Sequence, residues 1–410
     1  MVAAIFLIAF LSALALLLVG RLASKHPFLN GRVMKWMIGY HVFFWLVYYL
    51  YATFNPSDSR YYYIKVITDY RGPTWSSFYG TSTTFIEWLA YPFIRFFGFT
   101  YESMMVVFSF FGLIGFVYLY MFLKENIKFR HTILGYDLVT VIIFLPNLHF
   151  WSNSLGKGSV IFAGIGLFFY GISNLRTRWL HTLIGGIIIY HVRPHILLVV
   201  LVSAAVGFMF STKGVSVFLR AIFLVGASIA FFFIYKDVLT LVGIDEGEFV
   251  ADGMNLSHRA SELSKATSGI DISNYSLPEQ VFAFLYRPLF FDSPGLLGII
   301  VSFENVFYLF MTIRLFSMNG LKFLFTGSFL VKAAFLSFLT VTVALAQVSG
   351  NLGLAMRQKS QVMVLFMFVV IAFLDNQKMR AYQQGLRRQR RLAKFNDGVI
   401  GRRASESAQQ

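Results

Sequence analysis

Apolar runs of membrane-spanning length recur along most of the chain, separated by short polar or charged segments. Runs of about 18 or more apolar residues are typical of helices that cross a bilayer, and several shorter runs indicate tilted or paired helices. We therefore predict an all-α polytopic membrane protein with about 11 transmembrane helices. The predicted spans lie near Val2–Gly20, Lys35–Phe54, Met104–Leu123, Leu134–Phe150, Ser159–Ile172, Trp179–Tyr190, Ile196–Phe210, Val217–Val242, Leu296–Ile313, Phe323–Ala346 and Gln361–Leu374.

The polar segments divide the chain into a transmembrane domain and a tail. The transmembrane domain is predicted to cover residues 1–374, and a basic cytoplasmic tail to cover 375–410. Two outer loops, at 55–103 and 243–295, are too long to be turns. Because long loops in compact domains commonly carry function, we look for the site there.

Each long loop contains a predicted short helix. In the first loop, Phe85–Phe99 is aromatic and apolar but too short to cross comfortably, which favours an interfacial or re-entrant helix. In the second, a helix is expected to start near Ser276 and to end before the Arg287-Pro288 pair.

Composition narrows the class of protein. With 57% hydrophobic and only 13% charged residues, the chain is too apolar for an ordinary soluble domain. The net charge of +16 is concentrated enough in the tail to place the C-terminus in the cytoplasm, and an odd number of spans then places the N-terminus outside. The absence of cysteine excludes disulfides and thiolate metal sites, and the sequence contains no Walker loop or dinucleotide fingerprint.

The first polar group, SDSRYYY, follows the second predicted span. Asp58 is the leading candidate for a catalytic base, and Arg60 and Tyr62 are candidates for substrate binding, because tyrosine rings cover the apolar faces of sugars. The alternative is a turn-capping aspartate paired with Arg60. Asp69 is a second candidate catalytic carboxylate with a stronger turn interpretation, and Glu87 is a weaker alternative base.

The second group, PNLHFWSNSLGKG, lies between two predicted spans. Lys157 is placed where the next helix begins, and the small residues before it leave backbone amides open to a phosphate. The alternative is a lysine that extends to the membrane interface. Trp151 is a candidate sugar platform, and His149 is either a proton carrier or a hydrogen-bonded core histidine.

The third group is HVRPH, in which Arg193 could hold a diphosphate through its planar guanidinium. His191 and His195 are four residues apart, as two ligands on one helix face would be, but Pro194 interrupts that helix. We therefore predict substrate binding by these histidines and no metal site.

The last group, GNLGLAMRQKS, precedes the final predicted span. Arg357 and Lys359 are expected to form one cationic patch with Arg193 and Lys157, and with Arg287 from the second loop, that suits a diphosphate. Ordinary end-of-helix cations are the alternative, but these would be expected on the inner side.

Together these motifs resemble EpsG-like and Wzy-like surface-polysaccharide proteins, and in outline GT-C glycosyltransferases, over roughly Asn55 to Leu374. The resemblance implies lipid-linked sugar substrates, an outer-facing active site and arginines that hold the lipid diphosphate. It would make Asp58 the loop carboxylate, and Arg193 and Arg357 the diphosphate ligands.

The expected function is a glycosyltransferase or polymerase of the bacterial inner membrane. It would transfer saccharide from a polyprenyl-diphosphate or polyprenyl-phosphate carrier to a sugar hydroxyl on the outer face during surface polysaccharide synthesis. The alternative is a flippase for lipid-linked oligosaccharides, or another transporter. Expected partners are the lipid-linked saccharide, the bilayer and other polysaccharide-assembly proteins, with no nucleic acid. No cofactor is expected, although the sequence leaves a divalent cation open.

Overall fold

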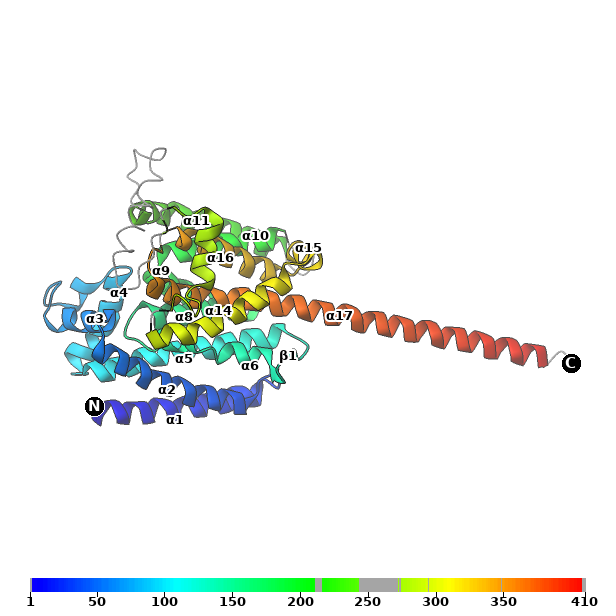
Figure 1. Cartoon of the computed structure of the whole chain (residues 1–410), viewed down its shortest axis with the longest axis horizontal. Coiled ribbons are helices and arrows are strands. Elements are labelled where there is room, and N and C mark those ends of the chain that lie inside the picture. The colour runs from blue at the N-terminus through cyan, green and yellow to red at the C-terminus, as the bar shows by residue number, and fades with distance from the viewer. Residues whose placement is uncertain are drawn as a thin grey trace.

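The structure is a computed structural model that describes residues 2–210, 216–242, 272, 274–293, 295–347 and 349–407. Within these ranges it is a bundle of helices, with one helix continuing far beyond the others at one end (Figure 1). The all-α prediction is thereby confirmed for the described residues. Most of the second predicted outer loop, 243–271, lies outside them.

The chain begins with a helical hairpin of α1 (Val2–Lys25) and α2 (Gly31–Phe54). Asn30 ends the connection between them, and its side-chain oxygen accepts hydrogen bonds from the backbone N–H groups of Arg32 at 3.0 Å and Val33 at 3.3 Å. Such a cap satisfies donors that have no partner within the first helical turn. The cap therefore fixes where α2 starts.

The first outer loop folds into four short helices at one end of the bundle: α3 (Asp58–Ile67), η1 (Trp75–Phe78), α4 (Thr83–Tyr91) and η2 (Pro92–Phe96). The predicted helical conformation within Phe85–Phe99 is confirmed. α3 and α4 lie near the start of α1 (Figure 1), and α5 (Tyr101–Asn126) then runs back through the bundle.

The predicted span Leu134–Phe150 is not one helix. It contains part of a two-stranded hairpin, β1 (Thr132–Ile133) and β2 (Tyr136–Asp137), followed by the six-residue helices α6 (Leu138–Ile143) and α7 (Pro146–Trp151). Proline cannot donate a helical hydrogen bond and forces the preceding residue into an extended conformation. Leu145 accordingly has ψ 124°, and the helix is interrupted there.

Three helices follow with short connections: α8 (Lys157–Ser173), α9 (Leu175–Val192) and α10 (Pro194–Met209). α8 is buried along nearly its whole length. Gly185 of α9 lies against α8 so closely that a Cβ atom there would be 2.6 Å from the backbone nitrogen of Phe168. Small residues permit such close approach between membrane helices.

The remaining helices are α11 (Val217–Val242), α13 (Leu277–Tyr286), α14 (Gly295–Leu315), α15 (Met318–Thr326), α16 (Phe329–Ala346) and α17 (Leu352–Ser407). The helix predicted to start near Ser276 is confirmed as α13, and Ser276 forms a capping box with Glu279. The predicted span Phe323–Ala346 is divided between α15 and α16.

Six helices in the described part of the chain are long and apolar enough to cross a membrane. They are α1, α2, α5, α14, α16 and the first part of α17. Shorter apolar helical segments lie at Leu138–Trp151, which comprises α6 and α7, and at Lys157–Ser173, Pro194–Met209 and Arg220–Ile229. The fold is that of a helical membrane protein.

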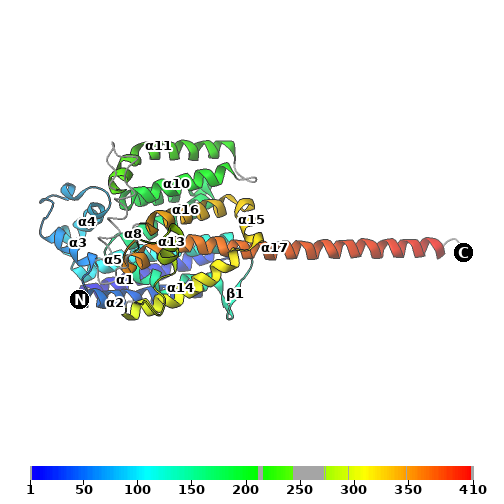
Figure 2. The same ribbon diagram turned by 45° about the horizontal axis from the view of Figure 1, so that its top comes forward.

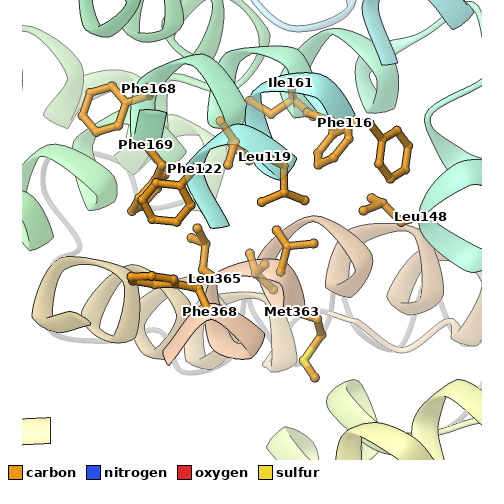
Figure 3. Packing of buried hydrophobic residues seen from close by; sticks show 14 of the residues in the cluster. Phe116, Leu119, Phe122, Leu148, Ile161, Phe168, Phe169, Met363, Leu365 and Phe368 are labelled. Atoms are coloured by element: carbon orange, nitrogen blue, oxygen red, sulfur yellow. The ribbon is translucent and has the colours of Figure 1, made fainter. Parts of the chain in front are cut away.

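The core is built where α5, α8 and α17 meet. Phe122 of α5 and Phe368 of α17, both labelled in Figure 3, have ring centroids 4.6 Å apart. The ring centroids of Phe116 of α5 and Phe162 of α8 are 4.8 Å apart. Aromatic side chains bury large apolar areas and favour tilted or edge-to-face contacts. This packing holds α8 and α17 against α5, and it thereby positions the charged residues at the starts of α8 and α17.

Candidate functional site

Four segments that are far apart in sequence meet at the end of the bundle that carries α3 and α4. Asp58 begins α3, Lys157 begins α8, Arg193 joins α9 to α10, and Arg357 lies in the second turn of α17. We call these four residues, together with Tyr62 and Trp151, the cationic cluster. All six were candidate site residues in the sequence.

The strongest contact of the cationic cluster joins Arg357 to Asp58. The Nη1 atom of Arg357 donates to Oδ2 of Asp58 at 2.6 Å. The arginine side chain is 13% exposed, whereas the aspartate is 63% exposed. The carboxylate is therefore accessible from outside while the guanidinium is held beneath it. The guanidinium carbon also lies 5.8 Å from the ring centroid of Trp151, within cation–π range.

Gly156 leaves space between two members of the cationic cluster. A Cβ atom at this position would lie 3.3 Å from Cε2 of Tyr62 and 3.8 Å from Nη2 of Arg357. The tyrosine ring and the guanidinium thus converge on the backbone just before α8. Burial raises the pKa of the Tyr62 phenol, so it stays protonated and able to donate a hydrogen bond.

The start of α8 adds backbone donors. Gly156 is its N-cap residue, and no side chain among the described residues caps the first turn. The first N–H groups of a helix have no intrahelical partner and carry the positive end of the helix dipole. Together with Lys157, they make this end of α8 suitable for a phosphate.

Ser82 was not recognised in the sequence but holds Lys157 in place. The Nζ atom of Lys157 donates to the hydroxyl oxygen of Ser82 at 2.8 Å, and the backbone N–H of Ser82 donates to the carbonyl of His191 at 2.6 Å. Ser82 has φ +63°, which is uncommon for a residue with a side chain. Its position before α4 was the available signal, because serine commonly precedes helices.

His191 lies beside this connection. Its Nδ1 is 2.9 Å from the carbonyl oxygen of Ile187, and its Nε2 is 3.1 Å from the hydroxyl of Tyr79. Because a carbonyl only accepts, Nδ1 carries the proton and Nε2 accepts from Tyr79 when the ring is neutral. His191 therefore orients the first outer loop against α9. His195, also predicted, is half-buried at the start of α10.

The cationic cluster carries excess positive charge. Lys157 lies within electrostatic range of both Arg193 and Arg357, and Arg193 also interacts with Arg357. Asp58 forms an ion pair with Arg357, and Asp58 and Glu87 both lie within electrostatic range of Lys157. Like charges held together in partly buried surroundings are unfavourable unless an anion compensates them.

Three buried donor atoms near the cationic cluster have no hydrogen-bond partner in the described part of the chain. They are Nε of Arg357, Nε1 of Trp151 and Nε2 of Gln361. Gln361 is only 4% exposed, and its Nε2 would lie 3.7 Å from a Cβ atom at Gly158. Since buried donors are nearly always paired, these atoms indicate a ligand with acceptor oxygens. Gln361 was missed because an uncharged residue at the start of a predicted apolar span gives no sequence signal.

Two predicted residues of the first loop have other partners. Asp69 pairs with Arg95, whose Nη2 donates to its Oδ2 at 2.9 Å. Arg60 is exposed, and its guanidinium lies 5.8 Å from the ring centroid of Tyr101. Glu87, the weaker alternative base, is fully buried and accepts a hydrogen bond from Arg71.

Lys359 is separated from Arg357 rather than forming one patch with it. It is fully buried, and its Nζ donates to the carbonyl of Arg287 at 2.6 Å and to Oδ1 of Asn305 at 2.8 Å. Residues two apart on a helix point about 200° apart, so both cannot face the same ligand. Arg287 is itself paired with Asp292.

His149 faces the interior of the bundle. It is fully buried, its Nδ1 lies 2.9 Å from Nδ1 of His41, and Phe116 stacks on its ring with centroids 3.8 Å apart. Its Nε2 contacts the carbonyl of Ile143 at 2.8 Å. Of the two interpretations of His149, the geometry matches a hydrogen-bonded core histidine.

In comparisons with known proteins, no protein-family model, no curated protein and no solved structure matches this chain. Within the described residues, no three His, Cys, Asp or Glu side chains are grouped as metal ligands. The functional interpretation therefore depends on the geometry of the cationic cluster.

Proposed function

We propose that the chain is a membrane-embedded glycosyltransferase or polymerase that uses a saccharide linked to polyprenyl diphosphate or polyprenyl phosphate. The observation that carries this proposal is the convergence of Lys157, Arg193 and Arg357, of which Arg357 pairs with Asp58, with unpaired donor atoms beside them. Such a site requires an anion with several acceptor oxygens. A lipid diphosphate at the rim of a helical bundle supplies it.

The proposed reaction uses the four charged residues of the cationic cluster. The bond between the donor sugar and its phosphate breaks, the anomeric carbon bonds to the acceptor oxygen, and the acceptor hydroxyl gives its proton to Asp58. The three cations stabilise the charge that develops on the leaving phosphate. When the phosphate takes the guanidinium of Arg357, Asp58 loses its ion-pair partner and becomes available as the base.

The proposed membrane setting is the bacterial cytoplasmic membrane, with the N-terminus and the cationic cluster outside and the tail of α17 in the cytoplasm. Support comes from the six long apolar helices of the described residues, several of which run side by side along the bundle (Figures 1 and 2). The basic tail then lies on the cytoplasmic side, as positively charged flanks usually do.

Replacing Arg193 by Ala is expected to reduce saccharide transfer by about 100-fold, because it removes one preorganised donor to the leaving phosphate. The measurement is release of polyprenyl diphosphate from a lipid-linked saccharide by the full chain in proteoliposomes. Arg387→Ala, in the exposed tail, is the matched control and should retain the rate. Transfer by Arg193→Ala at the control rate would falsify the proposed function.

Replacing Asp58 by Asn is expected to lower kcat by about 100-fold or more, because the amide cannot take the acceptor proton. Asn is similar in shape and still accepts a hydrogen bond from Arg357, so KM should change little. Steady-state kinetics of the same release reaction separate the two constants. If Asp69→Asn causes the drop in kcat and Asp58→Asn does not, the base is assigned to the wrong carboxylate.

Transport of a lipid-linked saccharide is the second candidate. It is favoured by Glu304 and Lys359, which are both buried within helices long enough to cross the membrane. Ionisable groups at such depth commonly mark transport pathways. A flippase would move a fluorescent lipid-linked saccharide across vesicle bilayers without consuming it, whereas a transferase would release its lipid diphosphate.

A further inference from the structure

A second candidate site lies at the opposite end of the bundle from the cationic cluster. A cavity of about 800 Å³ opens between the connection of α1 to α2, the end of α5 and the β1–β2 hairpin. Its lining includes Phe28, Asn30, Tyr120 and Lys128. Figure 1 shows β1 at the far end of the bundle from α3 and α4. Nothing in the proposed transfer reaction uses this cavity.

The charges that line this cavity do not cancel. Its two carboxylates are already paired: Asp137 with Lys124 at 3.0 Å, and Glu125 with Arg178 through two contacts of 2.6 and 2.8 Å. Lys128 and Arg130 are exposed, and neither forms an ion pair with any residue that the structure describes. Two positive charges at the cavity are therefore available to an anion.

A buried phenol provides a second, independent indication of a ligand. Tyr120 lines the cavity and is 0% exposed; the backbone of Asn30 lies near its hydroxyl, which forms no hydrogen bond of ordinary geometry with the described residues. A buried hydroxyl without a partner is unfavourable, because it has lost its contacts with water. A phosphate oxygen in the cavity would satisfy it.

We propose that this cavity binds the headgroup of an anionic phospholipid. Its lining combines the free cations with apolar side chains, including Phe28, Val33 and Val139, which a soluble phosphate would not need. It also lies where the apolar helices α1, α2 and α5 begin or end, at the level that lipid headgroups occupy. Basic pockets between membrane helices bind such headgroups. Two cations fit a headgroup that carries two negative charges.

The test uses the purified full chain in nanodiscs of phosphatidylcholine, with and without cardiolipin, and counts retained lipid by native mass spectrometry. Cardiolipin should remain bound and phosphatidylcholine should not. The Lys128→Gln, Arg130→Gln double variant should lose about thirtyfold in cardiolipin affinity, because each cation near the surface contributes about 1 kcal/mol. Tyr120→Phe should lose about fivefold through one hydrogen bond.

Arg387→Gln, Arg388→Gln is the matched control, since it removes the same charge from the exposed tail and should retain cardiolipin. Equal cardiolipin affinity in the cavity variant and this control overturns the proposal. Displacement of cardiolipin by inorganic phosphate at equal concentration also overturns it, because the cavity would then be a site for free phosphate. Saccharide transfer by the cavity variant at the normal rate would show that this site and the proposed reaction are independent.

Discussion

Saccharide transfer should fall by about 1000-fold when Arg357 is replaced by Ala, the largest effect expected for any single member of the cationic cluster. This guanidinium contacts Asp58, lies over Trp151 and approaches the backbone at Gly156. Its loss removes a charged donor to the leaving phosphate. The measurement is kcat/KM for release of polyprenyl diphosphate in proteoliposomes.

Two further variants show whether the guanidinium itself is responsible. Arg357→Lys keeps the positive charge but loses the planar pair of donors, so its rate should lie between those of the wild type and Arg357→Ala. Arg387→Ala lies on the same helix in the exposed tail and should be unaffected. Each of the three variants should unfold at the same temperature as the wild type, so that a change in rate does not reflect misfolding. If Arg357→Ala transfers saccharide within threefold of the control, the mechanism fails.

The second large effect concerns folding. Gly185→Ala is expected to lower the free energy of unfolding by about 1 to 3 kcal/mol, because the new methyl group has no space. It would lie 2.6 Å from the backbone nitrogen of Phe168 and 2.7 Å from the carbonyl oxygen of Gly164. Both atoms belong to the backbone of α8, so relief requires the two helices to separate.

The neighbouring glycine provides the control. A methyl group at Gly186 would make only an ordinary contact of 3.8 Å with the side chain of Leu197. Gly186→Ala should leave stability unchanged or raise it by up to about 1 kcal/mol, since alanine favours the helix. Thermal unfolding of both variants in one detergent tests the difference. Equal losses of stability in the two variants would show that the close contact between α8 and α9 does not depend on Gly185.

The sequence predicted the convergence of Lys157, Arg193 and Arg357 because each lies where an apolar run begins or ends. Alternation of the spans brings such positions to the same end of a bundle, whatever the packing of the helices between them. Asp58 and Tyr62 were predicted for the same reason. Their mutual contacts were not predictable, because these depend on how α3 folds back over α8 and α17.

The sequence does not show in which direction a side chain points from its helix or how the first outer loop folds, and the errors in the predicted site come from these two features. Lys359 and Arg357 were placed together because they are close along the chain, yet on α17 they point to opposite sides. Gln361 comes one turn after Arg357 and does lie near the cationic cluster. Ser82 reaches Lys157 through the fold of the first outer loop, which apolar patterning does not determine.

The error at Leu134–Phe150 has a local cause. Hydropathy alone predicts one span here, because the apolar run continues through Pro146. The backbone restrictions of proline instead divide the run into α6 and α7. The interruption shapes the turn that carries Trp151 and leads to Lys157. The proline within this apolar run therefore indicated the position of the cationic cluster better than hydropathy did.

α17 joins the cationic cluster to the tail as one rod. No loop interrupts it between Arg357 and Ser407, a rise of about 75 Å at 1.5 Å per residue, and it leaves the bundle in both views (Figure 2). Torque applied to the tail would reach Arg357 through continuous helix. A twist of about 10° would move a side-chain tip about 6 Å from the axis by about 1 Å. A misplacement of that size in a catalytic group is enough to change a reaction rate about 100-fold. Binding at the tail could therefore alter the reaction rate at the opposite end of the bundle.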